Sequence, residues 1–108
     1  MAGKSDFLGS HTFSADTTKT YDLSGGDYTR VFYTASVTNL DGGARITVYR
    51  AVSDGGSYAQ ASTFVMSGGT GPYHSEVIDV RGAGSIRFKA GALNGIDELL
   101  NIEVNAWS

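Results

Sequence analysis

Side chains that alternate with a period of two are the feature that most limits what this chain can fold into. The alternation is clearest from Thr29 to Val52, where two runs rich in β-branched and aromatic residues flank Asp41-Gly42-Gly43. Apolar residues occupy every second position of the first run, at Val31, Tyr33, Ala35 and Val37; in the second, Ile46, Val48 and Arg50 alternate with Thr47, Tyr49 and Ala51. Such alternation is typical of a β-strand, and the glycines supply the positive φ angles of a tight turn. The stretch therefore predicts a central β-hairpin.

Further strand-like runs follow the same rule along the rest of the chain. They are Thr12–Ser14, Lys19–Leu23, Gln60–Met66, Tyr73–Val80, Ser85–Ala90 and Leu99–Ala106. Glycines 13 residues apart separate many of them: Gly43, Gly56, Gly69, Gly82 and Gly95. No window of a dozen residues has a helical period, and Ile96–Leu100 is long enough for one helical turn at most. The sequence predicts an all-β fold, an antiparallel β-sandwich of about eight strands with a jelly-roll-like arrangement.

The length of 108 residues suits one domain, which we expect to span residues 11–108. Residues 1–10 are small and polar apart from Phe7 and Leu8, and they predict an N-terminal arm. Such an arm is either a disordered tail or an extended segment that docks on a neighbouring subunit. It contains no apolar run long enough for a signal peptide or a membrane span. These features favour synthesis in the cytoplasm and no membrane partner.

Charge and cysteine content exclude several classes of function. The formal net charge is −3, and the eight Lys and Arg residues are scattered, whereas nucleic-acid binding requires clustered cations. The chain has no cysteine, so it can form neither a disulfide framework nor a thiolate metal site. This suits a reducing compartment or a particle assembled inside a cell.

Catalytic constellations are not evident in the sequence. His11 and His74 lie far apart without metal-ligand spacing, and we expect both at the surface or in loops. Glu76, Asp79 and Glu103 fall on predicted strands, where a general acid–base pair is possible but solvated strand faces are the favoured interpretation. We expect a protein that is not an enzyme and that uses no cofactor.

Two kinds of ligand remain open from the sequence. Calcium prefers several oxygen ligands in loops, and three predicted turns contain aspartates: Asp41, Asp54 and Asp97. A carbohydrate-binding module would present a row of exposed aromatic rings, for which the candidates are Tyr49, Tyr58, Tyr73 and Trp107. Carbohydrate or receptor binding is therefore the alternative to a structural role.

Contacts between proteins are the favoured role. Phe32, Tyr49 and Val77 each fall on the face opposite to the main apolar set of their strand, so they either form an interface or pack beneath loops or a second sheet. Small β-domains also carry exposed edge strands that pair with other chains. We expect a homo-oligomer, most simply a trimer, with interface residues Phe7, Leu8, Phe32, Tyr49 and Trp107.

The chain resembles the small virion proteins of tailed bacteriophages, in particular head decoration or cement proteins. The resemblance lies in the arm of residues 1–10, in the Gly-Gly pairs at 42–43, 55–56 and 68–69, and in the segment IDVRGAGSIRFKAG from Ile78 to Gly91. It concerns the style of the whole chain and assigns a function to no single residue. It implies a β-sandwich or jelly roll, frequently trimeric, that sits on the major capsid protein in the virion and fastens neighbouring capsomers.

Overall fold

The computed structural model describes residues 5–14, 17–23, 28–38, 44–51, 57–66, 73–91 and 99–108. These residues form eight strands: β1 (Ser5–Phe13), β2 (Thr18–Asp22), β3 (Arg30–Thr38), β4 (Ala44–Ala51), β5 (Tyr58–Met66), β6 (Tyr73–Asp79), β7 (Ser85–Gly91) and β8 (Leu99–Trp107). The described residues include no helix that could cross a membrane. The predicted helical turn at Ile96–Leu100 begins outside them, and its last two residues, Leu99 and Leu100, start β8.

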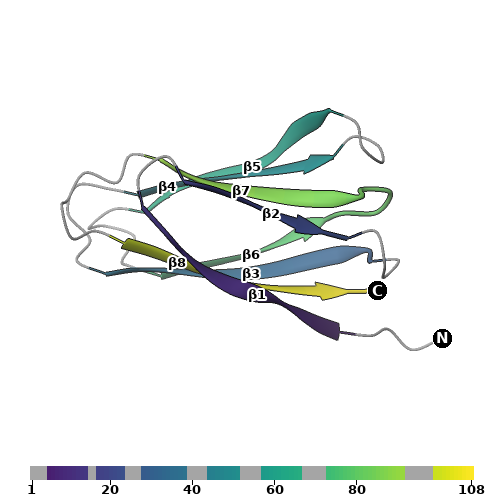
Figure 1. Ribbon diagram of the computed structural model, residues 1–108, viewed down its shortest axis with the longest axis horizontal. Coiled ribbons are helices and arrows are strands. Elements are labelled where there is room, and N and C mark those ends of the chain that lie inside the picture. Colours follow the sequence, from purple (N-terminus) through teal and green to yellow (C-terminus); the bar gives the residue numbers. More distant parts are fainter. Residues whose placement is uncertain are drawn as a thin grey trace.

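The strands form two four-stranded antiparallel sheets that face each other (Figure 1). The first sheet has the order β1-β8-β3-β6 and the second the order β2-β7-β4-β5. Only one pair of consecutive strands, β4 and β5, shares a sheet, and each of the other connections crosses from one sheet to the other. This is the eight-stranded jelly roll, so the predicted fold class is confirmed.

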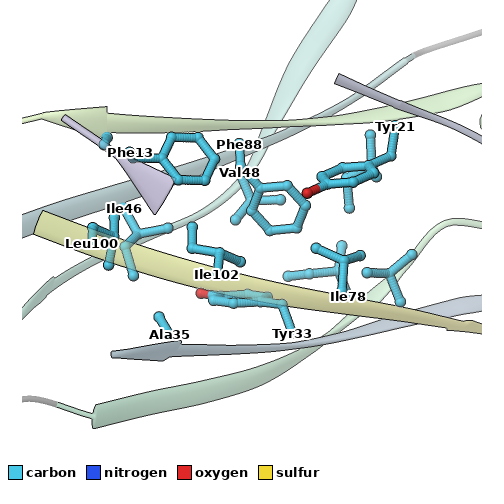
Figure 2. Packing of buried hydrophobic residues seen from close by; sticks show 14 of the residues in the cluster. Phe13, Tyr21, Tyr33, Ala35, Ile46, Val48, Ile78, Phe88, Leu100 and Ile102 are labelled. Atoms are coloured by element: carbon cyan, nitrogen blue, oxygen red, sulfur yellow. The ribbon is translucent and has the colours of Figure 1, made fainter. Parts of the chain in front are cut away.

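The core lies between the two sheets and takes one face of each strand. Every second residue of β3 and β8 is buried there, and so is every second residue of β7. At its centre the ring of Phe88 contacts Tyr33 of the opposite sheet edge-on, with centroids 5.2 Å apart, and Tyr21 of its own sheet at 5.9 Å (Figure 2). The buried residues of β3 are the predicted apolar set of Val31, Tyr33, Ala35 and Val37, so that prediction is confirmed.

The central hairpin predicted from Thr29 to Val52 is wrong. β3 and β4 form as expected, but β3 pairs with β6 and β8 in the first sheet, and β4 pairs with β5 and β7 in the second. Two strands that bury alternate residues show the same pattern whether they pair or face each other across a core. The predicted turn at Asp41-Gly42-Gly43 lies outside the described residues.

The predicted arm is also corrected, because Ser5 to Ser10 belong to β1 and pair with β8. Phe7 pairs with Asn105 and Gly9 with Val104, so Leu8 is an extra residue, a β-bulge. Gly9 follows with a φ of 142°, a conformation that favours glycine. The bulge interrupts the alternation, which is why the sequence did not reveal this part of the strand. Residues 1–4 lie outside the described residues.

A polar cluster closes the side of the sandwich between the edge strands β5 and β6. The Glu76 carboxylate accepts hydrogen bonds from the hydroxyl of Tyr33 (2.9 Å) and from that of Ser62 (2.8 Å), which lies on the opposite sheet. His74 stacks on Phe64 of β5, with centroids 3.7 Å apart. Burial and the bond to Glu76 raise the pKa of Tyr33, so its hydroxyl stays protonated and donates. Side chains thus join the two sheets where no backbone hydrogen bonds do.

The two core tyrosines make a matched test of these polar contacts. Tyr21 is also buried, but its hydroxyl has no hydrogen-bond partner in the described part of the chain. Tyr33→Phe should lower the free energy of unfolding by about 1–2 kcal/mol because it removes a bond to a carboxylate. Tyr21→Phe should leave it unchanged or raise it by up to about 1 kcal/mol, since a buried unpaired hydroxyl is destabilising. Urea unfolding measures both, and equal losses in the two variants would contradict the assignment.

Candidate functional site

An apolar patch lies on the outer face of the first sheet. The strand register places Phe7, Asn105, Phe32 and Val77 in one row across β1, β8, β3 and β6. Trp107 stacks on Phe32 with the rings nearly parallel, 8° apart, and their centroids separated by 5.9 Å. Phe7 is 61% exposed and Val77 is 48% exposed. We call Phe7, Phe32, Val77 and Trp107 the aromatic patch.

The patch exists because these four residues occupy the outward positions of their strands. On β3, for example, Val31 and Tyr33 face the core, which leaves Phe32 between them on the outside. A hollow of about 260 Å³ adjoins the patch at Val77, and it is lined by Thr29, Arg30, Val77, Asp79 and Arg81. The face therefore offers apolar anchors beside a charged recess.

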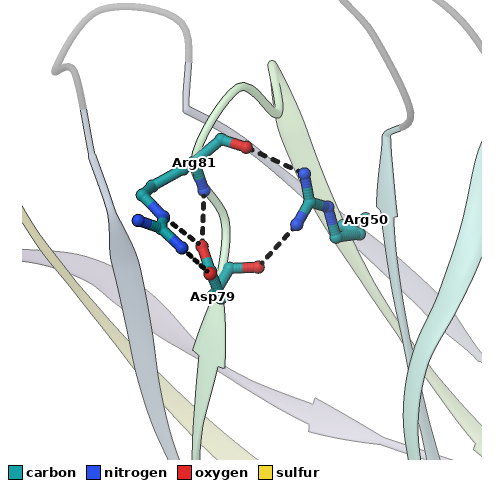
Figure 3. Close-up of polar contacts among 3 residues, drawn as sticks. All are labelled: Arg50, Asp79 and Arg81. Carbon is teal, nitrogen blue, oxygen red and sulfur yellow. Dashed lines mark hydrogen bonds and ion pairs between the residues drawn. The ribbon is translucent and has the colours of Figure 1, made fainter.

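The charged recess is held in shape by a network of two arginines and one aspartate (Figure 3). Arg81 donates to both carboxylate oxygens of Asp79, at 3.1 Å and 2.7 Å, and its backbone N–H donates at 3.0 Å. Arg50 of β4 reaches over from the other sheet and donates to the backbone carbonyls of Asp79 (3.0 Å) and Arg81 (2.8 Å). Together these bonds fasten the second sheet to the segment that joins β6 to β7.

The turn at Arg81 contains the one glycine of the 13-residue series that lies in the described ranges. Gly82 has a φ of 80°, and the N–H of Ala83 donates to the carbonyl of Val80 at 2.9 Å. Such a type II turn favours glycine at its third position. The turn brings Arg81 back over Asp79, so the glycine helps to create the bidentate contact.

The predicted interface residues lie at three places in the structure. Phe7, Phe32 and Trp107 share the outer face of the first sheet. Leu8, at the bulge, packs against the core. Tyr49 lies on the outer face of the second sheet, in the row of Gln60 and Arg87. The structure thus brings three of the five predicted residues together, and it adds Val77.

The three strand carboxylates do not form an acid–base pair. Glu76 is held in the polar cluster, Asp79 is bound by Arg81 on the outer face, and Glu103 is exposed on β8. The histidines are half-buried on strands and not in loops, which corrects that prediction. His11 on β1 and His74 on β6 occupy opposite edges of the first sheet.

The ligand candidates from the sequence are also divided. Asp41, Asp54 and Asp97 lie outside the described residues. Within the described ranges, no three His, Cys, Asp or Glu side chains are grouped so that they could hold a metal ion. Of the aromatic candidates, Tyr73 and Trp107 belong to the first sheet, whereas Tyr49 and Tyr58 belong to the second. These four rings therefore do not form one platform.

Sequence reasoning missed the network of Arg50, Asp79 and Arg81. A signal was present, because Arg50 stands in an inward position of an alternating strand, where an apolar residue is usual. Arg50 pairs with Ile86, at the end of the core, and its side chain extends to the opposite sheet. An arginine at such a position needs acceptors, and backbone carbonyls supply them here.

Comparisons with known proteins show the fold. Neither the protein families nor the curated proteins contain a match to this sequence. Among solved structures, the SPBc2 prophage-derived protein YomS is similar with a TM-score of 0.65 at 10% identity, over 98% of this chain and 93% of that one. The family 29 carbohydrate-binding module CBM29-2, as a D114A mutant, is similar with a TM-score of 0.56 at 10% identity, over 96% of this chain and 91% of that one. The PBSX exported protein XepA gives 0.55 at 14% identity, over 94% of this chain and 36% of that one.

The Asp79 network predicts a specific dependence of stability on pH. Hydrogen bonds from the Arg81 side chain and backbone lower the pKa of Asp79 from 3.8 to about 2. A carboxylate whose pKa falls on folding stabilises the native state above its unfolded pKa, and this contribution is lost as the pH falls through the folded pKa. Asp79→Asn should therefore lower the free energy of unfolding at pH 7, and the difference from wild type should shrink between about pH 4 and pH 2.

Urea unfolding at pH 7, 4, 3 and 2 measures this difference. Glu103→Gln is the matched control, since Glu103 is an exposed strand carboxylate with no ion pair in the described part of the chain. It should have little effect at pH 7. A destabilisation by Asp79→Asn that stays constant down to pH 2 would show that charge is not the cause.

Proposed function

We propose that this protein is a non-enzymatic structural protein of a phage virion that decorates the capsid through protein–protein contacts. The single observation that carries the proposal is the aromatic patch on the outer face of the first sheet. Large apolar side chains lie there on the outer face of the sheet, outside the core. Exposed apolar groups beside a polar rim are the usual mark of a protein interface.

The patch has the composition of an interface centre. Aromatic residues are enriched among the side chains that dominate binding energy, and they act when a partner removes them from water. The stacked pair of Phe32 and Trp107 presents a flat apolar surface, and Phe7 and Val77 extend it to both edges of the sheet. Arg81 and Arg30 stand at its border and suit an acidic or polar rim on the partner.

The fold supports a virion location. YomS is prophage-derived and XepA is described as a PBSX exported protein, and both have this sandwich architecture. The capsid-decoration role and the major capsid protein as partner rest on the resemblance in sequence style and on the patch. The alternative, a carbohydrate-binding or receptor-binding module, has support in the likeness to CBM29-2. The aromatic platform expected for it is absent among the four candidate rings, which lie on both outer faces.

Attachment to the capsid should depend on the aromatic patch. Val77→Asp should weaken attachment at least tenfold, because it places a charge within a desolvated apolar contact. Val65→Asp is a matched control: Val65 is 45% exposed, against 48% for Val77, and it lies on the edge strand of the other sheet. The measurement counts copies bound to undecorated capsids assembled from the major capsid protein of the genome that encodes this chain.

Equal attachment of the two variants would remove the patch from the mechanism. Deleting residues 1–10 is a poorer test, since it would remove the part of β1 that pairs with β8 and would lower the stability as well. Both aspartate variants should keep the wild-type urea midpoint, because both side chains point away from the core.

We further propose that the protein assembles as a homotrimer. The sandwich has four edge strands, β1, β6, β2 and β5, and exposed edges are usually covered. Light scattering at micromolar concentration should give about three times the chain mass of 11.3 kDa. A measured mass of one chain for the protein in solution would contradict the trimer.

A further inference from the structure

A polar hollow of about 570 Å³ lies on the outer face of the second sheet, opposite to the aromatic patch. Its lining comes from three neighbouring strands: Lys89 and Gly91 on β7, Arg45, Thr47 and Tyr49 on β4, and Gln60, Thr63 and Val65 on β5. Its size falls within the roughly 300–1,000 Å³ of small-molecule sites. The proposed capsid contact does not use this face.

The strand register explains why the sheet is hollow here. Three cross-strand rows make up the site: Gly91–Arg45–Val65, Lys89–Thr47–Thr63 and Arg87–Tyr49–Gln60. Short side chains form the floor, where the hydroxyl oxygens of Thr47 and Thr63 are 3.5 Å apart, and Thr47 is only 9% exposed. Long side chains, those of Arg45, Lys89, Tyr49 and Gln60, surround the floor. The site is thus built by the order of short and long residues on these three strands.

A bulge shapes the wall formed by the edge strand. Val48 pairs with Ser62 and Tyr49 with Gln60, so Ala61 is an extra residue on β5. It lies between Gln60 and Thr63, two of the lining residues. A β-bulge bends its strand and increases the local twist, so the edge strand departs here from a flat ladder.

The charges of the hollow are unusual for this protein. The chain has a net charge of −3, yet the hollow contains two cations and no carboxylate. Neither the Arg45 side chain nor the Lys89 side chain makes an ion pair or hydrogen bond within the described ranges. The neighbouring Arg87, by contrast, is occupied: its guanidinium lies 3.9 Å from the ring centre of Tyr58, and it donates to Thr20 at 3.3 Å. The hollow thus places the unpaired charges of Arg45 and Lys89 beside the hydroxyls of Thr47 and Thr63. This arrangement suits a ligand that carries both anionic groups and hydroxyls.

We propose that this hollow binds an acidic oligosaccharide. Arg45 and Lys89 would hold its anionic groups, the hydroxyls of Thr47 and Thr63 and the amide of Gln60 would bond to its hydroxyls, and the half-buried ring of Tyr49 would pack against the apolar face of a sugar. A peptide is a poorer fit. β4 and β7 are paired on both sides, so strand addition is open only at the outer edge of β5 and not within the hollow, and Val65 is the single aliphatic side chain in the lining.

Calorimetric titration of the full chain tests the proposal with four probes. They are a galacturonic acid trisaccharide, a glycerol phosphate oligomer, a neutral glucose trisaccharide and a tri-glutamate peptide. The uronate should bind. Binding of the phosphate oligomer without binding of the uronate would overturn the saccharide as the ligand, because that oligomer has no sugar ring for Tyr49 to contact. The neutral sugar and the peptide should bind at least tenfold more weakly. Equal binding of the neutral sugar or of the peptide would overturn the proposal, as would no binding of either anionic probe at millimolar concentration.

Variants locate the binding to this face. Arg45→Gln and Lys89→Gln should each weaken binding of the anionic probe about tenfold, the value of one charge-assisted hydrogen bond. Arg30→Gln is the matched control, because it removes the same charge from the outer face of the first sheet and should change the affinity less than twofold. An equal loss in Arg30→Gln would show that net charge, and not this site, causes binding. Thr47→Val should weaken binding while the salt dependence stays as in wild type.

The result is separable from the proposed capsid role. Val77→Asp should bind the anionic probe with wild-type affinity, and Arg45→Gln should attach to capsids as wild type does. A protein that fails on capsids but binds the probe would contradict the capsid role alone.

Discussion

The contact between Tyr33 and Phe88 joins the two sheets at the centre of the molecule, and the rest of the structure depends on this packing. The two rings belong to opposite sheets and meet edge to face, with Tyr21 on the other side of Phe88 (Figure 2). Since the two sheets share no backbone hydrogen bonds in the described ladders, side-chain contacts and the connections that cross between the sheets hold them together. Aromatic pairs of this geometry add to the stabilisation from burial.

Polar side chains complete the junction at two places on the periphery. Between β5 and β6, Ser62 and Tyr33 converge on Glu76. At the turn after β6, Arg50 bonds to two carbonyls of the opposite side, and Asp79 fixes Arg81 above them (Figure 3). Each place links polar groups of the two sheets by hydrogen bonds, and each restricts how the sheets slide over one another.

Because the inner faces of both sheets form the core, the side chains that can contact other molecules lie on the outer faces. Those faces differ in kind: the first sheet presents the aromatic patch, and the second presents a polar hollow with two cations that have no partner among the described residues. They point in opposite directions (Figure 1). A protein seated on a particle through its first sheet would therefore turn its second sheet, with the proposed saccharide site, toward the surroundings.

The sequence by itself determined which residues form strands and which side of most strands is buried. Val31, Tyr33, Ile102 and Val104 alternate with polar residues, and burial of one strand face requires this order in any sandwich. The prediction failed at Leu8, where a β-bulge shifts the alternation of inward and outward side chains. An arm was therefore predicted in place of a strand.

Only the tertiary structure decided which strands are neighbours, because a strand has the same alternation whether its successor pairs with it or faces it. Pairing in turn decided the sites. Phe7, Phe32, Val77 and Trp107 come from four strands, and Arg45 meets Lys89 through the ladder of β4 and β7. Distances between residues far apart in sequence depend on which strands pair. Neither the composition of the chain nor the period of its alternation predicts that pairing.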